Sequence, residues 1–270
     1  MNLLEIRKKY LDENYLADDA TAKVCQDIIL SKISRSSLAQ NVTIKGGVVM
    51  HHLSKDNRRA TRDMDLDFIK YSLEDKSLEN FINKLNSIND NVKLRILYPI
   101  EKLNHKDYSG KRIYIELTDE YNNKINSKLD IGVHKDFDIK QEEYCFDLSN
   151  ISETVTLLIN SKEQIFTEKL KSLLRIGIRS TRYKDVFDMY YLINDMGLDK
   201  DKLKRYFNKI IFNDETMFEN NIFDIYQRLD EILRNKGFLK ELHNLKGNWL
   251  SADPIQCTET ILKFIKSLEE

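Results

Sequence analysis

The spacing of hydrophobic residues changes near residue 155. Before that point hydrophobic and polar side chains often alternate, as where Met64, Leu66 and Phe68 are separated by Asp65 and Asp67. Successive side chains of a β-strand point to opposite faces, so this alternation is typical of strands with one buried face. Beyond residue 155 hydrophobic residues recur every three or four positions, which is typical of helices. The pattern predicts an α/β domain over residues 1–155 and an α-helical domain over residues 156–270.

The same pattern predicts the individual elements. Two helices are expected between residues 2 and 35, a short helix after Gly46-Gly47, and another over residues 74–85. Strands are expected over residues 41–45, 61–70, 92–96, 112–117 and 128–133. The polar segment 101–111, which contains Ser109-Gly110, is expected to be a turn or hairpin loop. A helix over residues 164–178 opens the second half.

Three carboxylates line one side of the predicted strand 61–70. Asp63, Asp65 and Asp67 alternate with hydrophobic residues, which spaces the acids about 6.5–7 Å apart along one face. Like charges this close raise one another's pKa and are unfavourable without a cation among them. Magnesium binds through one or two carboxylates and substrate phosphates, so this strand is a candidate Mg²⁺ site. The alternative is a half-exposed strand whose outer face is simply acidic.

Two further segments favour a site that handles phosphate. Lys45-Gly46-Gly47 joins a predicted strand to a predicted helix, where glycines let the backbone approach a phosphate and the helix N-terminus offers free N–H groups. A Gly-Gly pair in a plain turn is the alternative. On strand 128–133, Asp130 lies on the side opposite the hydrophobic residues. If those residues face the core that Met64 faces, Asp130 shares a face with the other acids, as a two-metal site requires.

Lys169 is a charged residue within an apolar arc of helix 164–178, beside Phe166, Leu170 and Leu173. Burying a lysine is costly unless it meets an anion or extends its stem to water. We therefore predict that its ammonium points into the cleft between the domains and contacts a triphosphate. A lysine that merely reaches water at the domain interface is the alternative.

A basic cluster lies on the opposite face of this helix and just beyond it. Its members are Lys171, Arg175, Arg179 and Arg182. Contact with an RNA backbone and a plain solvated face both fit this pattern. On the next predicted helix, Asp185 and Asp188 lie on a flank away from the apolar centre, where an exposed pair without a function is the alternative to a site.

Composition narrows the class of protein. The 43 Lys and Arg nearly cancel the 44 Asp and Glu, so a nucleic acid would have to be bound by a local patch. The 3 cysteines are far apart and have no metal-site spacing, which is typical of reduced thiols. Charges interrupt the N-terminus and every apolar stretch. We therefore expect a cytoplasmic protein with no signal peptide and no membrane span.

Two segments resemble a known family. The run IKGGVVMHHLSKDNRRATRDMDLDF resembles the first motif of polymerase-β-like nucleotidyltransferases, and particularly the AbiEii branch, in which K-G-G precedes R-x-T-x-D-x-D. That pattern falls on Arg59, Thr61, Asp63 and Asp65. The run EQIFTEKLKSLLRIGIRSTRYKDVFDMYYL resembles the second signature of the same family, E-K-L followed by K-D-x-x-D. That one falls on Lys169, Asp185 and Asp188. Gly-Gly stands where the wider superfamily has Gly-Ser.

The resemblance implies a nucleotidyltransferase-like fold and a toxin of a toxin–antitoxin pair, of the kind associated with abortive phage infection and antiviral defence. Related toxins transfer a nucleotide from an NTP to the acceptor end of tRNA. We therefore expect Mg²⁺, an NTP, an RNA acceptor and an antitoxin encoded nearby. Two alternatives remain open: a protein hydroxyl as acceptor, and a non-catalytic module that only binds nucleotide.

Roles follow from the motifs and the strand pattern together. Metal is expected on Asp63, Asp65 and Asp130, with Asp67 as a competing ligand. Nucleotide binding is expected of Lys45, Gly46, Gly47, Arg59 and Thr61. Lys169 is expected to neutralise triphosphate charge, and Asp185 to support the acceptor side.

Overall fold

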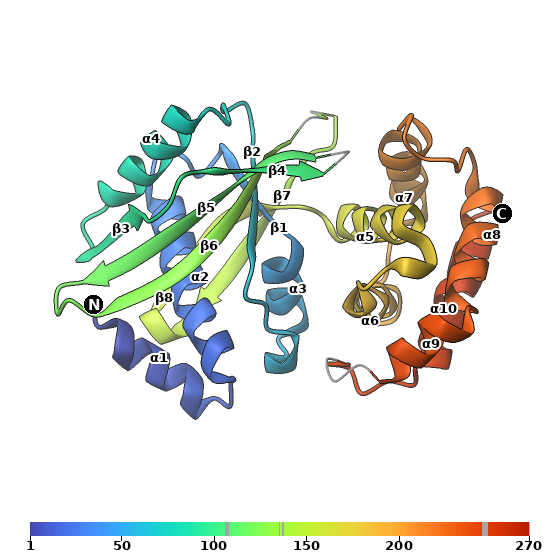
Figure 1. Cartoon of the computed structure of the whole chain (residues 1–270), viewed down its shortest axis with the longest axis horizontal. Coiled ribbons are helices and arrows are strands. Elements are labelled where there is room, and N and C mark those ends of the chain that lie inside the picture. The colour runs from blue at the N-terminus through green and yellow to red at the C-terminus, as the bar shows by residue number, and fades with distance from the viewer. Residues whose placement is uncertain (106–107, 135, 137, 245–247, 270) are drawn as a thin grey trace. The chain divides into compact units, whose positions relative to one another are not determined.

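The computed structural model describes residues 1–105, 108–134, 136, 138–244 and 248–269. The chain divides into two compact units, Met1–Asn160 and Ser161–Glu270. The first unit is built on a mixed sheet and the second is helical, which confirms the predicted fold class (Figure 1). The division follows Asn160 because strand β8 (Glu153–Ile159) still belongs to the sheet, whereas the hydrophobic pattern placed the change near residue 155.

An eight-stranded sheet forms the core of the first unit, in the order β3-β5-β6-β2-β1-β8-β7, with β4 paired to β5. The other strands are β1 (Val42–Lys45), β2 (Met64–Phe68), β3 (Val92–Ile96), β4 (Glu101–His105), β5 (Tyr108–Asp119), β6 (Lys124–Val133) and β7 (Glu142–Leu148). Strand β2 runs antiparallel to β1 and parallel to β6. Asp65, the second acid of the D-x-D motif, therefore lies inside the sheet, with a strand on either side.

Parts of this sheet differ from the prediction. The segment 101–111, expected to be a turn or hairpin loop, is a hairpin that consists mostly of strand: Glu101–His105 is β4, which pairs antiparallel with β5 from Tyr108 onward, and residues 106–107 lie outside the described part. Glu101 and Lys102 are exposed, and Leu103 is the one apolar residue of Glu101–His105, so the sequence of this strand shows no alternation of apolar and polar residues. Strands β7 and β8 were not predicted. In β7 only Phe146 and Leu148 are buried, which is a short alternation.

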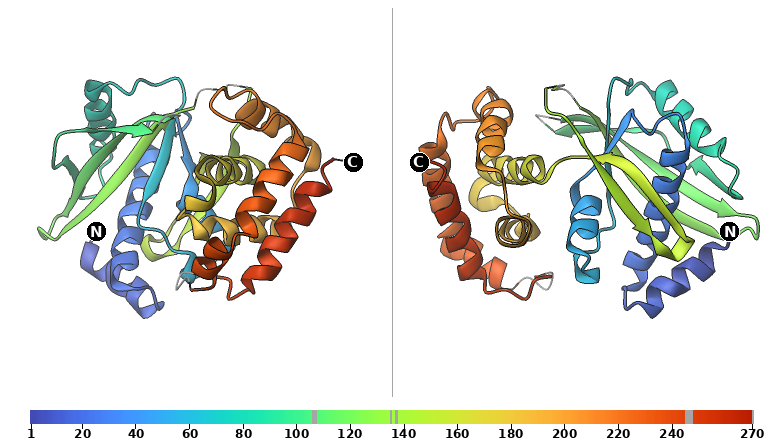
Figure 2. Two further views of the ribbon diagram at one scale, coloured as in Figure 1. Left: turned by 45° about the vertical axis from the view of Figure 1, so that its right-hand side comes forward. Right: turned by 180° about the vertical axis from the view of Figure 1, so that it is seen from behind.

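The α-helices in the described part of the first unit are α1 (Leu3–Asp12), α2 (Ala17–Arg35), α3 (Gly46–Ser54) and α4 (Asp75–Asn86). Helix α2 packs on β6 and β8, and α4 packs on β3 and on α2. The two views in Figure 2 show that α2 runs along the twisted sheet. Helix α3 follows β1 directly and packs on β1 and β2, so the Gly-Gly segment begins a helix as predicted.

The second unit consists of helices. They are α5 (Lys162–Ile176), α6 (Tyr183–Tyr191), α7 (Lys200–Phe207), α8 (Ile222–Leu233), α9 (Lys236–His243) and α10 (Pro254–Lys266). Helix α5 ends two residues before the predicted residue 178, because Gly177 takes a φ of 65° and starts a separate turn. Among the described residues, no helix is long and apolar enough to cross a membrane.

Helix α3 is anchored by a buried histidine. His51 is 6% exposed; its Nε2 lies 3.0 Å from the Tyr15 hydroxyl and its Nδ1 lies 3.2 Å from the Asp56 carbonyl oxygen. Burial lowers the pKa of His51 to about 4, and the nearby Lys23 adds to this shift. The ring is therefore neutral at physiological pH, and it fixes the helix whose first residue is Gly46.

This burial predicts a loss of stability in mild acid. Unfolded His51 titrates near its ordinary pKa of 6.5 and the folded ring only near 4, so the unfolded state binds the proton first. Stability should fall as the pH drops from about 6.5 towards 4, by up to about 3 kcal/mol for this group. The free energy of unfolding should be measured at several pH values by urea titration, with circular dichroism as the signal. It should fall less steeply with decreasing pH in His51→Gln than in the wild type. His243→Gln, an exposed histidine on α9, should keep the wild-type dependence. An equal fall in all three proteins would contradict the assignment.

Candidate active site

Asp65 is the central acid of the first unit. In the sheet it lies between Lys45 of β1 and Asp130 of β6, each directly opposite it in register. The structure thus brings Asp65 and Asp130 side by side, as the alternation predicted. The pKa of Asp65 is raised to about 6, chiefly by burial. The charge of Lys45 lowers this pKa, whereas the charges of Asp130, Asp63 and Asp67 raise it. The carboxylates of Asp63, Asp67 and Asp130 are therefore close enough to Asp65 for their charges to repel it.

Each acid beside Asp65 has a cation of its own. The Asp63 carboxylate lies 2.7 Å from Lys128 Nζ, and that of Asp67 lies 2.7 Å from Lys45 Nζ. Asp63 precedes the first residue of β2, so it is not part of the strand in which it was predicted. Its side chain is 52% exposed, whereas Asp67 is buried. Asp63 is therefore accessible to a ligand in a way that Asp67 is not.

Asp130 accepts two hydrogen bonds from Arg112. The Nε and Nη2 groups of Arg112 donate to its two carboxylate oxygens, both at 2.7 Å. Such a bidentate pair fixes the plane of the carboxylate. Asp130 also raises the pKa of Arg112 through these bonds. Neither Arg112 nor Lys128 was predicted as a site residue, although β5 and β6 form a hairpin that places Arg112 opposite Asp130.

The acids do not form a closed metal cage. Within the described ranges, no three His, Cys, Asp or Glu side chains are arranged so that they could hold a metal ion by themselves. Magnesium commonly uses only one or two carboxylates and takes its other oxygens from phosphates and water. Asp65 and Asp130, on adjacent strands about 4.8 Å apart, are the pair that fits this chemistry.

The two glycines bring the start of α3 onto the acidic strand. Gly46 has a φ of 66°, and a Cβ atom there would overlap Oδ2 of Asp65. A Cβ atom on Gly47 would lie 2.7 Å from Oγ1 of Thr61, which is closer than real contacts allow. Arg59, from the same motif, is 5% exposed. The K-G-G and R-x-T-x-D-x-D segments therefore pack directly against each other, and free amides of the first turn of α3 lie beside Asp65.

In the second unit, the two halves of the other motif also meet. Lys169 of α5 lies with its Nζ 2.5 Å from Oδ1 of Asp185 and 2.8 Å from Oδ2 of Asp188, both on α6. The lysine side chain is 11% exposed. The apolar arc around Lys169 thus contains the anions that its burial requires, and both are supplied by the same unit.

The flank position expected for Asp188 is wrong. Asp188 is fully buried, and its Oδ1 accepts a hydrogen bond of 3.1 Å from Trp249 Nε1. A buried carboxylate is tolerated when hydrogen bonds and a cation satisfy it, and here Trp249 and Lys169 do so. Trp249 was not predicted as a member of this cluster because it comes from a segment far along the chain, before α10.

Comparison with known proteins agrees with both motifs. The family model described as "Nucleotidyl transferase AbiEii toxin, Type IV TA system" matches residues 28–252, which is most of the chain and includes both motifs. The chain belongs to the AbiEii family. This membership makes it a nucleotidyltransferase of the type IV toxin class and implies an antitoxin partner.

Other comparisons are more distant. No curated protein matches this AbiEii chain. It is similar to the crystal structure of an antigenic nucleotidyltransferase-like protein from Paracoccidioides brasiliensis, with 14% identity and a TM-score of 0.44, over 82% of this chain and 92% of that one. A likeness at this level supports no conclusion about substrate or mechanism.

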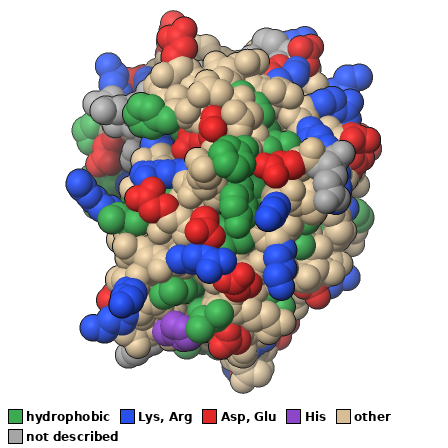
Figure 3. All heavy atoms as spheres, turned by 90° about the vertical axis from the view of Figure 1, so that its right-hand side faces the viewer, with side chains coloured by type: hydrophobic (Ala, Val, Ile, Leu, Met, Phe, Trp, Pro, Cys, Tyr) green, Lys and Arg blue, Asp and Glu red, His purple; other side chains and the backbone are tan. Residues whose placement is uncertain are grey.

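The predicted basic cluster is not a continuous face in the AbiEii chain. Lys171 is paired with Asp214, and an Arg175 nitrogen lies 3.5 Å from the same carboxylate. Because α5 ends at Ile176, Arg179 lies on a separate turn, and Arg182 lies 3.9 Å from Asp185. On the face shown in Figure 3, basic and acidic side chains are interspersed. RNA contact by these four residues stays a prediction.

The glycine packing predicts a sharp difference between two substitutions. Gly46→Ala and Gly197→Ala both place a side chain at positive φ, which costs about 1–2 kcal/mol of stability. A Cβ at Gly197 meets no atom within 4 Å, whereas at Gly46 it displaces the Asp65 carboxylate. Gly46→Ala should therefore abolish nucleotide transfer, and Gly197→Ala should lose only stability. Activity assays with urea unfolding on both proteins test this. Equal activity in the two would contradict the close approach of Gly46 to Asp65.

The Lys169 cluster predicts unequal costs for two matched substitutions. Asp185→Asn and Asp188→Asn each neutralise one carboxylate bonded to Lys169. Asp188 has no contact with water, so its loss should cost about 2–4 kcal/mol, while the more accessible Asp185 should cost about 1 kcal/mol or less. Trp249 is the single tryptophan of the chain, so its fluorescence during urea unfolding reports on this unit. A larger loss for Asp185→Asn would contradict the described burial.

Proposed function

We propose that this AbiEii-family chain is a Mg²⁺-dependent nucleotidyltransferase toxin that acts in the cytoplasm and transfers NMP from an NTP to RNA, with the tRNA 3′ end as the candidate acceptor. The observation that supports this most is the placement of Asp65 in register with Asp130, beneath the first turn of α3. That arrangement joins acids suited to magnesium with backbone amides suited to phosphate.

The reaction is a displacement at the α-phosphorus of the NTP. The acceptor hydroxyl oxygen forms a bond to phosphorus, the bond to the pyrophosphate oxygen breaks, and pyrophosphate leaves with that electron pair. Mg²⁺ held by Asp65 and Asp130, with phosphate and water as its other ligands, would neutralise charge on the triphosphate and on the leaving oxygens. Asp63, which is 52% exposed, is the further candidate ligand. Asp130, oriented by Arg112, takes the proton of the attacking hydroxyl.

Residues around the acids have supporting roles in this proposal. The amides of Gly46 and Gly47 bind triphosphate oxygens, because the N-terminus of α3 has free donors and a partial positive charge. Lys45, held by Asp67, adds a positive charge beside them. Thr61 lies against Gly47 and so keeps the glycine segment close to the D-x-D strand. Nucleotide binding by Arg59 and Thr61 stays a prediction. Since Asp67 is buried whereas Asp63 is 52% exposed, we assign the metal-binding acids of the D-x-D motif to Asp63 and Asp65.

Lys169 is proposed to neutralise triphosphate charge, with Asp185 supporting the acceptor. What supports this is the match of Lys169 and Asp185 to the second motif of the family, which lies within the matched residues 28–252. In the structure the ammonium is paired with Asp185 and Asp188 at 2.5 and 2.8 Å, so contact with a triphosphate would require it to exchange at least one of these partners.

The test is transfer of label from each α-labelled NTP to total tRNA in the presence of Mg²⁺. Asp65→Asn should lower the rate about 100-fold or more, the scale of a lost transition-state contact. Asp75→Asn is the control, since it removes an acid on α4 of the same unit that is 65% exposed and has no role in the proposed site, and it should keep the wild-type activity. Circular dichroism shows whether both variants are folded.

Each other outcome has a defined meaning. Label on protein instead of RNA would make a protein hydroxyl the acceptor. Binding of NTP without any transfer would make the chain a nucleotide-binding module. Full activity in Asp65→Asn would overturn the assignment of the active site.

A further inference from the structure

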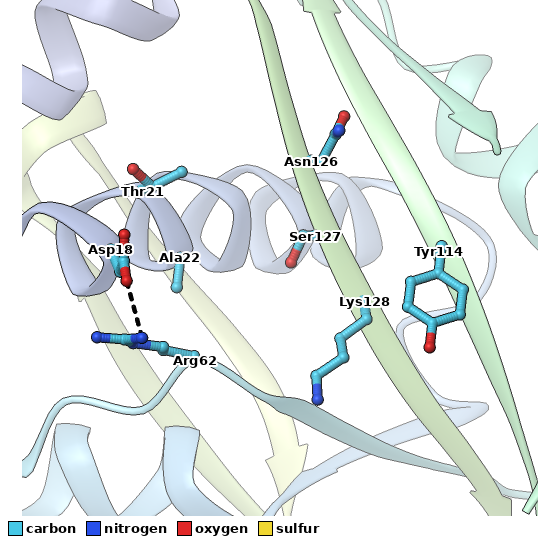
Figure 4. A pocket seen from close by; sticks show the side chains of 8 residues that line it. All are labelled: Asp18, Thr21, Ala22, Arg62, Tyr114, Asn126, Ser127 and Lys128. Carbon is cyan, nitrogen blue, oxygen red and sulfur yellow. Dashed lines mark ion pairs between the residues drawn. The ribbon is translucent and has the colours of Figure 1, made fainter.

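A cavity of about 340 Å³ lies in the first unit beside the carboxylates. Tyr114 of β5 and Lys128 of β6 line it together with Asn126, Ser127 and Arg62, and the first turn of α2 closes another side (Figure 4). Strand β2 pairs with β6 only from Leu129 onward. The segment of β6 before that residue therefore extends past the end of β2, and this leaves the space that the cavity occupies.

The cavity is next to the proposed reaction centre. Tyr114 and Lys128 are opposite each other in the β5–β6 ladder, and Arg112 and Asp130 form the matching pair two residues further along. One such step along a strand is about 6.5–7 Å. Lys128 also reaches Asp63 at 2.7 Å. A molecule in the cavity is therefore roughly one nucleotide away from the acids.

The side chains in the cavity have the chemistry that binds single-stranded nucleic acid. Tyr114 offers an aromatic ring, half-buried and packed edge-on against exposed Tyr98 with ring centroids 5.6 Å apart. Aromatic rings stack on unpaired bases, and neighbouring cations bind the phosphates between them. Lys128 and Arg62 are the cations of this cavity. Lys128 is paired with Asp63, and Arg62 is paired at 2.8 Å with both Asp18, which also lines the cavity, and Asp19, so a phosphate would have to compete with these acids. The Asn126 amide can hydrogen bond to the edge of a base.

We propose that this cavity binds the terminal nucleotide of the acceptor RNA strand, with its base stacked on Tyr114. The inference rests on the proposed function and extends it to the acceptor. Because β2 lies between β1 and β6, the proposed binding sites for the NTP and for the acceptor RNA lie on opposite sides of Asp65. The glycine amides proposed for the triphosphate adjoin β1, on one side of Asp65, whereas the cavity adjoins β6, on the other side. The acceptor hydroxyl then approaches Asp130 from the side opposite to the triphosphate, as an in-line displacement requires.

The test measures binding separately for the two substrates. The probes are a fluorescein-labelled single-stranded oligoribonucleotide of eight residues that ends in a 3′-deoxynucleotide, and each of the four NTPs without RNA. Tyr114→Ala should weaken binding of the oligoribonucleotide about 10-fold, the scale of one lost base stack, and leave the Kd of the NTPs unchanged. Tyr114→Phe, which keeps the ring, should restore RNA binding. Tyr121→Ala, an exposed tyrosine in the turn between β5 and β6, is the control and should bind like the wild type.

Several results would overturn the proposal. They are wild-type RNA binding in Tyr114→Ala, loss of NTP binding in that variant, equal loss in Tyr114→Phe, or no RNA binding by the wild type. In the transfer assay, Tyr114→Ala should raise KM for RNA about 10-fold without changing KM for the NTP. Failure of the proposed function is distinct from these results. Wild-type protein that binds RNA through Tyr114 but transfers no label would refute the transferase and leave the cavity assignment intact.

Discussion

The first unit is organised around the repulsion among four carboxylates. The negative charge of Asp65 is the most unfavourable of the four. Burial and the charges of the other three acids raise its pKa, which is about 6. Like charges in such a place persist only when cations are held among them or a ligand supplies positive charge. Three other strands of the sheet supply these cations. Lys45 of β1 pairs with Asp67, Arg112 of β5 with Asp130, and Lys128 of β6 with Asp63. Strand order and register are thus as much a part of the site as the acids themselves.

The sequence predicted which acids share a face of the sheet, but it did not predict which cations pair with them. Alternation along one strand shows which side chains share a face, and it placed Asp65 and Asp130 correctly. The partner of a side chain depends instead on the register between strands, which alternation does not contain. The sequence does contain one indication of the register between β5 and β6. The short turn between these strands places Thr118 opposite Lys124, and counting residues away from the turn then places Arg112 opposite Asp130.

Other errors came from contacts between distant segments. Helical periodicity places Asp188 on a polar flank because it considers one helix at a time, whereas the structure buries this residue under Trp249. Strand β4 has one apolar residue, Leu103, and its segment was expected to be a turn or hairpin loop. Residue patterns therefore identify what a single element buries against the core. They do not identify a polar residue that another segment of the chain covers.

The position of β1 has a consequence for how the first unit is assembled during synthesis. This four-residue strand lies between β2, which follows soon after it in the chain, and β8, which ends at Ile159. Its residue Lys45 and the glycines after it cannot be held by a complete sheet until β8 has left the ribosome and paired, and such pairing of distant segments is slow. A nascent chain that stops before β8 can pair β1 with β2 and β2 with β6, but the other edge of β1 stays without its partner strand. The sheet around the glycine segment is therefore completed only when nearly all of the first unit has been made.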